Sequence, residues 1–451
     1  MRKYLFLLLS ILVLTSLALV ACAPTPTEPP PPTDTPVPTK APEPTDTPVP
    51  TEAPEEGPPD LTGETIRIYG LIDFSGPFAA STAPMAQGTT DIVDYYNAIG
   101  GIFGAQIEMV FEDTGGKVDE AVAIYNRFTG EDDNIVMILL FTSADEEALR
   151  DRVKEDKIPT MGMAPSTTAL YGVEDGWLFT AIPLYPEQLA NFMDYVVANW
   201  DSIKPAGAGD EIKLAHLSWP GAFGQASLTD ESQAYIEALG VEIVANEQYE
   251  MSPTADTTTA ILNAQAAGAN VIWTNTLAHG PAVLLNDLHE LGLRDQFVVG
   301  GCFLTMDFPT YAFLADPSYG EGFYAAFPYA WWSETDNPAI QTALEIAEKN
   351  ERGPEALILG RLIVQSGLDV ARHAIEQAIL DVGFENLNGE AVYNALTQIQ
   401  DYEVMGGLTT VDFTNGIRAS RISQIRQIQG GPGQFVIIQD FTELPDLRPR
   451  P

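Results

Sequence analysis

Apolar and polar positions alternate along this chain in a way that is typical of α/β proteins. From Thr65 onward, short apolar runs of the kind that form buried strands are separated by longer segments with helical spacing of their apolar residues. The expected strands of a first series lie at 65–72, 106–112, 135–141 and 158–163, with helices at 85–98, 118–128 and 145–155. A second series from Glu211 onward has expected strands at 212–217, 241–249 and 270–275, with helices at 227–239 and 257–267. Two similar βα series predict two similar lobes.

The first residues have the pattern of a secretory signal. Two basic residues precede an uncharged run from Tyr4 to Val20, as a positive n-region precedes an apolar h-region. The run is also long enough for an uncleaved membrane anchor. However, Leu19-Val20-Ala21-Cys22 resembles the lipobox of bacterial lipoproteins, in which the cysteine is diacylated and becomes the first residue. We therefore expect a signal peptide at 1–21, a lipid on Cys22, and a location on the outer face of the cell membrane.

A Pro- and Thr-rich segment follows, and we expect it to act as a tether over residues 22–61. It contains almost no large apolar residue from Ala23 to Asp60 and so has nothing to bury in a core. Residues 32–43 recur as residues 44–55 with a single difference, and repeated Thr-Pro favours extended polyproline II. Cys302 is the only other cysteine, so an acylated Cys22 leaves no pair for a disulfide.

Length and charge narrow the function classes. The 451 residues, with a hydrophobic fraction of 45%, are sufficient for more than one packed core. The chain has 63 acidic and 22 basic residues and a formal net charge of −41 at pH 7. This charge opposes binding to nucleic acid or to an anionic membrane through the protein's own surface. We expect no nucleic-acid partner.

Sequence motifs of catalysis and of metal binding are missing from the chain. The four histidines have no spacing that would form a metal site with each other or with the cysteines. There is no phosphate-binding loop, dinucleotide fingerprint or nucleophile elbow. Asp113-Thr114-Gly115 matches the triplet of aspartic proteases but occurs once, and we interpret it as a turn at a strand end. We therefore expect a binding protein with no metal or cofactor, and not an enzyme.

Several short sequence segments along the chain resemble the Leu/Ile/Val-binding-protein type of periplasmic solute-binding proteins. They follow the family's order within residues 64–441, and they lie at 72–77, 97–104, 107–113, 158–159, 167–170, 223–224 and 288–293. The resemblance implies a type I periplasmic binding protein fold, an α/β fold in which two Rossmann-like lobes are joined by three crossovers. It places lobe 1 at 62–183 plus 326–408, lobe 2 at 184–325 plus 409–441, and a C-terminal tail at 442–451.

The same resemblance implies a function outside the cytoplasm. Proteins of this type capture a small molecule between their lobes by hinge closure and deliver it to the permease subunits of an ABC importer. We expect a monomer that binds a small polar or carboxylate solute, such as an amino acid or an amide. The alternatives are a ligand-sensing receptor module with the same fold and, with less support from the motifs, a hydrolase.

Candidate ligand contacts in lobe 1 lie in the loops after its strands, because ligands of parallel α/β sheets bind at the carboxyl ends of the strands. Ser143 begins the pattern Ser143-Ala-Asp-Glu146, in which the serine is the expected N-cap of the next helix. The resemblance implies that Ser143, Ala164 and Ser166 contact the ligand, with the two threonines after Ser166 as substitutes if the loop is shifted. Ser75, in the loop after the first strand, is a further candidate.

Lobe 2 departs from the family where the ligand's ammonium group is usually held. Leu277 stands where an aromatic residue is expected, and Gly301-Cys302 stands where an acidic residue is expected. An ammonium group buried without a carboxylate is unfavourable. We therefore expect a ligand without an α-ammonium group, unless Asp73 or Glu187 supplies the charge. The aromatic candidates for the cleft, which are equally candidates for the lobe cores, are Tyr185, Trp219 and Phe223.

Overall fold

The computed structural model describes residues 57–431 and 433–449. The expected signal peptide, Cys22 and residues 22–56 of the expected tether lie outside the described residues. Within the described part of the chain, no helix is both long and apolar enough to cross a membrane.

The first lobe is built on a sheet of five parallel strands. Its order is β2-β1-β3-β4-β5, so the chain winds outward from β1 in both directions. The strands are β1 (Thr65–Ile72), β2 (Gln106–Asp113), β3 (Ile138–Leu140), β4 (Thr160–Gly162) and β5 (Leu178–Phe179). The connections contain α2 (Ala79–Ala98), α3 (Val118–Glu131), α4 (Ser143–Glu155) and α5 (Thr167–Tyr171). β1 is buried continuously from Ile68 to Ile72, as expected for a strand covered on both faces.

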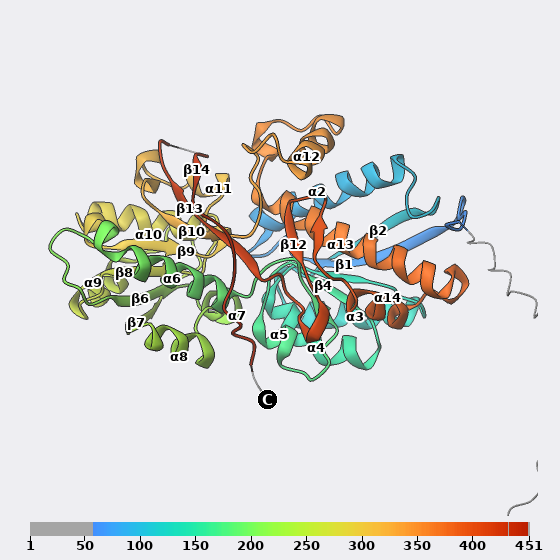
Figure 1. Ribbon diagram of the computed structural model, residues 1–451, viewed down its shortest axis with the longest axis horizontal. Helices are drawn as coiled ribbons and strands as arrows, with labels where there is room; N and C mark the ends of the chain where they lie inside the picture. The colour runs from blue at the N-terminus through green and yellow to red at the C-terminus, as the bar shows by residue number, and fades with distance from the viewer. Residues whose placement is uncertain (1–56, 432, 450–451) are drawn as a thin grey trace, which may run out of the picture. The chain divides into compact units, whose positions relative to one another are not determined.

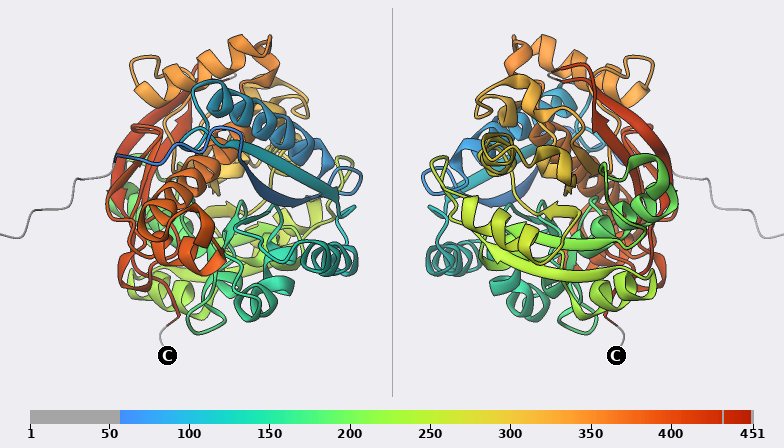
Figure 2. Two further views of the ribbon diagram at one scale, coloured as in Figure 1. Left: turned by 90° about the vertical axis from the view of Figure 1, so that its right-hand side faces the viewer. Right: turned by 90° about the vertical axis from the view of Figure 1, so that its left-hand side faces the viewer.

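The second lobe is built on a mixed sheet of seven strands, in the order β14-β13-β10-β9-β8-β6-β7. Its parallel strands are β6 (Lys213–Ser218), β7 (Glu242–Gln248), β8 (Val271–Thr274), β9 (Val298–Gly301) and β10 (Tyr324–Phe327). The antiparallel strands β13 (Ile422–Ile428) and β14 (Phe435–Glu443) complete the sheet, and Figure 2 shows them in red along one side of the described unit.

Helices and short 3-10 helices connect the strands of the second lobe. The helices are α6 (Tyr185–Ile203), α7 (Gly221–Gln225), α8 (Asp230–Ala238), α9 (Thr258–Ala266), α10 (His279–Glu290) and α11 (Phe308–Tyr311). The 3-10 helices are η1 (Arg294–Gln296), η2 (Phe303–Thr305) and η3 (Pro317–Gly320).

Three crossovers join the lobes (Figure 1). The chain passes from β5 into α6, returns from β10 into α12 (Pro338–Lys349), and passes again from β12 (Thr409–Val411) to β13. After the return, α13 (Leu359–Val382) packs against α2 and β4, and α14 (Gly389–Leu396) packs against α13, so these helices belong to the first lobe. The ladder of β11 (Tyr402–Val404) with β12 spans the expected lobe boundary at 408/409. The topology confirms an α/β fold with two Rossmann-like lobes joined by three crossovers.

The expected strands and helices are found, with shifts at their ends. The strand expected at 65–72 agrees with β1, while the strand expected at 135–141 is reduced to β3. The helix expected from Met85 begins at Ala79, ahead of Pro84. The prediction that Ser143 is the N-cap of α4 is wrong, because the capping oxygen is Thr142 Oγ1, which accepts the N–H of Asp145 at 3.2 Å.

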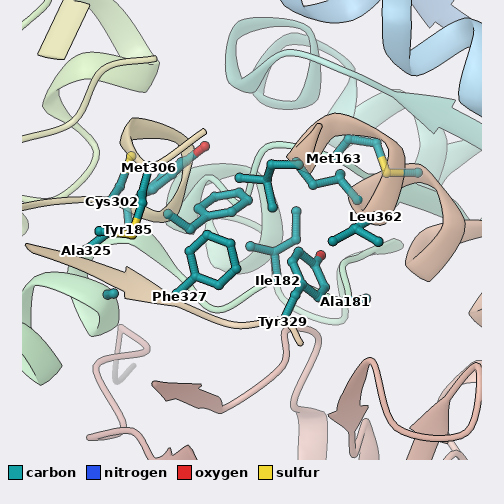
Figure 3. Close-up of a cluster of buried hydrophobic side chains, with 14 of the residues drawn as sticks. Met163, Ala181, Ile182, Tyr185, Cys302, Met306, Ala325, Phe327, Tyr329 and Leu362 are labelled. Atoms are coloured by element: carbon teal, nitrogen blue, oxygen red, sulfur yellow. The ribbon is translucent and has the colours of Figure 1, made fainter. Parts of the chain in front are cut away.

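The lobes share a buried apolar cluster beside the crossovers (Figure 3). It joins Met163 and Leu362 of the first lobe to Cys302, Met306 and Phe327 of the second. Cys302 is a free, fully buried cysteine, and burial raises the pKa of its thiol to about 12. The thiol therefore packs as a small apolar group.

Candidate ligand-binding cleft

A cavity of about 200 Å³ lies between the two lobes, at the carboxyl ends of strands from both sheets. The first lobe contributes Phe78, Ser81, Thr82, Met85, Phe141, Thr142, Ser143, Ala144, Met163, Ala164 and Ile363. The first crossover and the second lobe contribute Tyr185, Pro220, Gly221, Ala222, Phe223, Met251, Leu277 and Leu304. Because both lobes line the cavity, its shape depends on how the lobes are placed on each other.

Aromatic side chains close the cleft from both lobes. Phe78, the N-cap residue of α2, meets Phe223 of α7 edge to face, with ring centroids 6.4 Å apart. Phe223 also meets Tyr185 at 5.4 Å and Trp219 at 6.2 Å. Trp219 is buried behind Phe223 and does not line the cavity. Phe223 thus contacts the first lobe at this end of the cleft.

Leu277 reaches the cleft from a loop with an unusual backbone. The next residue, Ala278, has φ 48° and ψ −108°, a combination that alanine rarely adopts. It is the N-cap residue of α10, and the turn there carries the chain from β8 into the helix. Such strain occurs most often in ligand-binding and active-site loops.

Two buried hydroxyl groups in the cleft have no hydrogen-bond partner among residues 57–431 and 433–449. They are Ser143 Oγ, in the first turn of α4, and Tyr185 Oη, at the start of α6. Burial raises the pKa of Tyr185 well above its ordinary value, while the nearby Ser143 side chain acts in the opposite direction. Buried hydroxyls without partners are unfavourable, so this pair is suited to hydrogen bonding with a bound molecule.

A buried carboxyl group holds the loop after β4. Glu146 of α4 accepts the N–H of Ala164 at 3.0 Å and, more weakly, the N–H of Ser166 at 3.5 Å. Gly162 leaves room for this group, since a Cβ atom there would lie 2.5 Å from Glu146 Oε1. Burial raises the pKa of Glu146 well above its ordinary value, although the two N–H groups oppose the shift.

Ser166 and Ser75 have hydroxyls that are used inside the protein. Ser166 Oγ accepts the N–H of Ala169 at 3.3 Å as the N-cap of α5 and donates to Glu147 Oε1 at 2.6 Å. Ser75 is exposed and donates to Asp113 Oδ2 at 2.7 Å. Neither side chain lines the cavity.

The charged groups considered for a ligand's ammonium, Asp73 and Glu187, do not line the cavity. Asp73 accepts backbone N–H groups of its own loop, among them that of Phe78 at 2.9 Å. Glu187 accepts the N–H of Leu447 at 3.3 Å, and burial raises its pKa to about 8. Among the described residues, no three His, Cys, Asp or Glu side chains are grouped as a metal site requires.

A larger, open hollow of about 890 Å³ lies elsewhere on the first lobe. Its lining includes Thr65 and Ile66 at the start of β1 and Asn134 and Val136 ahead of β3. It therefore lies at the amino ends of the strands. Ligands of parallel α/β sheets bind at the opposite, carboxyl ends.

The sequence profile described as "Periplasmic binding protein" matches residues 65–432, from the start of β1 to beyond the end of β13. The chain belongs to the periplasmic binding protein family. The "Amino acid binding protein" of Pseudomonas aeruginosa is 25% identical over 263 residues, 57% of this chain and 66% of that protein. The "Leu/Ile/Val-binding protein homolog 7" of Brucella abortus is 23% identical over 239 residues, 52% of this chain and 58% of that protein. The matches thus span less than two thirds of either relative.

Solved periplasmic binding proteins share the fold of this chain. A branched-chain amino acid ABC transporter protein of Thermus thermophilus with bound valine aligns with a TM-score of 0.73 and 20% identity, covering 86% of this chain and 98% of that one. A fatty acid ABC transporter substrate-binding protein of Thermomonospora curvata aligns with a TM-score of 0.70 and 21% identity, covering 87% and 96%. These similarities support the two-lobed type I fold.

The structure of this periplasmic binding protein brings together five of the predicted ligand contacts. Ser143, Ala164, Tyr185, Phe223 and Leu277 line the cavity, whereas Ser75, Ser166 and Trp219 do not. The apolar part of the lining was not predicted from the sequence, and it includes Phe78, Met85, Met163, Met251, Leu304 and Ile363. Phe78 directly follows the family-like segment at 72–77, and its place in the loop after the first strand could have predicted it as a cleft residue. The others carried no signal that distinguishes them from core residues.

Proposed function

We propose that this chain is an extracytoplasmic solute-binding receptor of an ABC importer and that its solute binds in the cleft between the lobes. The observation that carries the proposal is the cavity lined by both lobes at the carboxyl ends of both sheets, with the unpartnered hydroxyls of Ser143 and Tyr185. The three crossovers provide a hinge about which the lobes can close on the solute. The permease would then recognise the closed form.

The location and the assembly follow from the same proposal. The signal-like segment at 1–21 and the lipobox at Leu19 to Cys22 support export and a lipid anchor on the outer face of the membrane. A receptor of this kind acts as a monomer that meets the permease subunits, and the tether allows it to reach them. The names of its relatives and structural neighbours refer to amino acids, valine and fatty acids as ligands.

The surroundings of Ser143 favour binding over hydrolysis. A nucleophilic serine needs a general base within hydrogen-bond reach. Among the described residues, no His, Asp or Glu lines the cavity. The carboxyl group of Glu146 is turned toward the backbone of Ala164. Ser143 is therefore suited to hold a solute and not to attack one.

The test is to identify solutes that remain bound when the protein is purified from its native source. Small molecules released by denaturation are identified by mass spectrometry and added back in thermal unfolding experiments, where a ligand of the folded state raises Tm. We expect Leu277→Trp, which fills the cavity, to lose the solute. Leu262→Trp, on the exposed face of α9, should keep it. Equal retention by both variants, or conversion of the solute into a product, would contradict the proposal.

A further inference from the structure

The cavity between the lobes has an unusual absence of charge for a site expected to bind amino acids. Of the side chains that line it, none carries a charge, and most are apolar. The hydroxyl of Thr82 bonds to the backbone oxygen of Phe78 at 3.0 Å, and that of Thr142 caps α4. Of the remaining hydroxyls, that of Ser81 is partly exposed, whereas those of Ser143 and Tyr185 are buried and without a partner in the described part of the chain.

We propose that the ligand is a compact, uncharged, largely apolar molecule whose single hydroxyl or carbonyl end bonds to Ser143 Oγ and Tyr185 Oη. This inference rests on the proposed solute-binding function and specifies the chemistry of the solute. An uncharged preferred ligand excludes amino acids, free carboxylates and amines from that role.

The first reason is the absence of a counter-ion. A charged group that leaves water for an apolar cavity loses its hydration, and only a buried opposite charge or several strong hydrogen bonds can offset that loss. Among residues 57–431 and 433–449, no Lys, Arg, Asp or Glu side chain lines the cavity. A zwitterionic amino acid would leave both of its charges unpaired there.

The second reason concerns anions. Backbone N–H groups after a parallel strand are the usual substitute for a cation, but in this chain Glu146 already occupies those of Ala164 and Ser166. Gly162 lets the Glu146 carboxyl group sit directly against β4, so the arrangement is built into the strand. Asp145 is buried next to Glu146 with an unpartnered Oδ2. Where either of these acids is ionised, its negative charge behind the cavity opposes a carboxylate ligand.

The third reason is size and surface. A cavity of about 200 Å³ is smaller than the roughly 300–1,000 Å³ of most ligand pockets. Its walls present aromatic rings at Phe78, Phe141 and Phe223 and flexible thioethers at Met85, Met163 and Met251. Aromatic edges and sulfur atoms make favourable contacts with a flat or branched apolar body. The cavity thus fits a small ring compound better than an extended chain.

The hydroxyl pair defines the polar end. Ser143 Oγ and Tyr185 Oη can each donate and accept a hydrogen bond. A ligand hydroxyl can donate to one and accept from the other, and a ligand carbonyl can accept from both. Because Ser143 belongs to the first lobe and Tyr185 to the first crossover, one ligand oxygen would link the lobe to the hinge.

The experiment measures binding of two matched sets of probes by calorimetry, with mature protein freed of solute by unfolding and refolding. One set is benzyl alcohol, benzoate and benzylamine; the other is cyclohexylmethanol, cyclohexanecarboxylate and cyclohexylmethylamine. L-Leucine and L-phenylalanine complete the panel. We expect each alcohol to bind at least about tenfold more tightly than its charged partners. Ser143→Ala and Tyr185→Phe should each weaken alcohol binding about twofold to tenfold, and the matched Tyr319→Phe should not.

Two results would overturn the inference, and they separate it from the proposed function. Tighter binding of a carboxylate, an amine or an amino acid in the cleft would contradict the uncharged ligand while supporting a solute receptor. Failure of both alcohols to bind at millimolar concentration would also overturn the inference. The receptor function is tested separately. It is supported if the purified wild-type protein releases a solute that Leu277→Trp does not retain.

Discussion

Ser143 and Ser166 carry the same hydroxyl group, yet the fold uses them differently. Ser166 Oγ caps α5 and donates to Glu147, while Ser143 Oγ has no partner among the described residues. The reason is that Thr142, the residue before Ser143, provides the N-cap of α4. Ser143 is thereby released from the capping role that its sequence pattern suggested and is left facing the cleft.

We predict opposite effects for the two alanine variants. Ser143→Ala removes a hydrogen bond to the solute and should raise Kd about twofold to tenfold, with little change in stability. Ser166→Ala removes a helix cap and should lower the free energy of unfolding by about 0.5–2 kcal/mol, with little change in Kd. Calorimetry with the co-purified solute and urea unfolding of the solute-free protein measure the two effects. Equal loss of affinity in both variants would place Ser166 against the ligand.

The helix α13 shows how an element of one lobe depends on the other. Its N-cap residue, Ile358, offers no capping side chain. Instead, Asp307 of the second lobe accepts the N–H of Leu359 at 3.0 Å as well as the N–H of Phe308 at 2.8 Å. A carboxyl group from lobe 2 thus serves the first turn of a helix in lobe 1, and the same helix carries Ile363 to the cleft.

We therefore predict that Asp307→Ala lowers the free energy of unfolding by about 1–3 kcal/mol and also weakens solute binding. The second effect is expected because the cap fixes α13 relative to Leu304 and the rest of the second-lobe wall. Asn388→Ala is the matched control, since Asn388 caps α14 within a single lobe by accepting the N–H of Ala391 at 3.0 Å. The control should lose stability alone. An unchanged Kd in Asp307→Ala would show that this cap does not affect the cleft.

The sequence predicted most of the helices and strands but few of the side chains that line the cleft. Strands such as 65–72 are marked by continuous apolar residues, and this signal is local. The cap of α13 by Asp307 joins residues far apart in the chain, and no local pattern indicates it. The same holds for Ile363 and Leu304, which are ordinary core residues in sequence and meet at the cleft only because the crossovers bring the lobes together.

The folded unit begins earlier than the expected tether boundary. Leu61 is buried, and its N–H donates to the carbonyl oxygen of Phe103 at 2.7 Å. We predict that a chain beginning at Gly57 is as stable as the mature protein and binds solute equally well. A chain beginning at Glu64 should lose about 1.5–3 kcal/mol from the missing leucine side chain alone. Urea unfolding measures the difference, and Leu61→Ala in the longer chain should reproduce much of it. Lower stability of the Gly57 chain would show that earlier residues join the fold.

For the whole molecule, buried acids connect stability to pH. Burial raises the pKa of Asp145 to about 6, of Asp307 to about 7 and of Glu187 to about 8, and it raises that of Glu146 as well. The folded protein therefore holds protons that the unfolded chain has released above about pH 4–5. The stability that these protons provide is complete at low pH and is lost as the pH rises toward 8. The formal net charge of −41 adds repulsion in the same direction.

Other groups limit this trend at the acidic end. Burial lowers the pKa of His216 to about 4, so the unfolded chain binds its proton first as the pH falls below about 6.5. The hydrogen bonds of Arg448 lower the pKa of Asp446 to about 2, and that contribution is lost in stronger acid. Burial also lowers the pKa values of His279, His289 and His373, so all four histidines oppose the raised carboxyl groups between pH 5 and 8. These three histidines are only partly buried, whereas Asp145, Glu146 and Glu187 are buried, so the carboxyl groups dominate. Maximum stability is thus expected near pH 5, and not at neutral pH.

We predict that urea unfolding of the solute-free protein gives a larger free energy at about pH 5 than at about pH 8. Asp307→Asn keeps the acceptor for Leu359 but cannot ionise, so it should reduce the difference by about 1 kcal/mol or more. Asp336→Asn, which changes an exposed carboxyl group, is the control for the altered net charge and should leave the difference nearly unchanged. If the wild-type protein is less stable at pH 5 than at pH 8, the buried carboxyl groups are ionised in the fold. In that case the acidic groups behind the cleft would carry full negative charge, and a carboxylate solute would be disfavoured still more strongly.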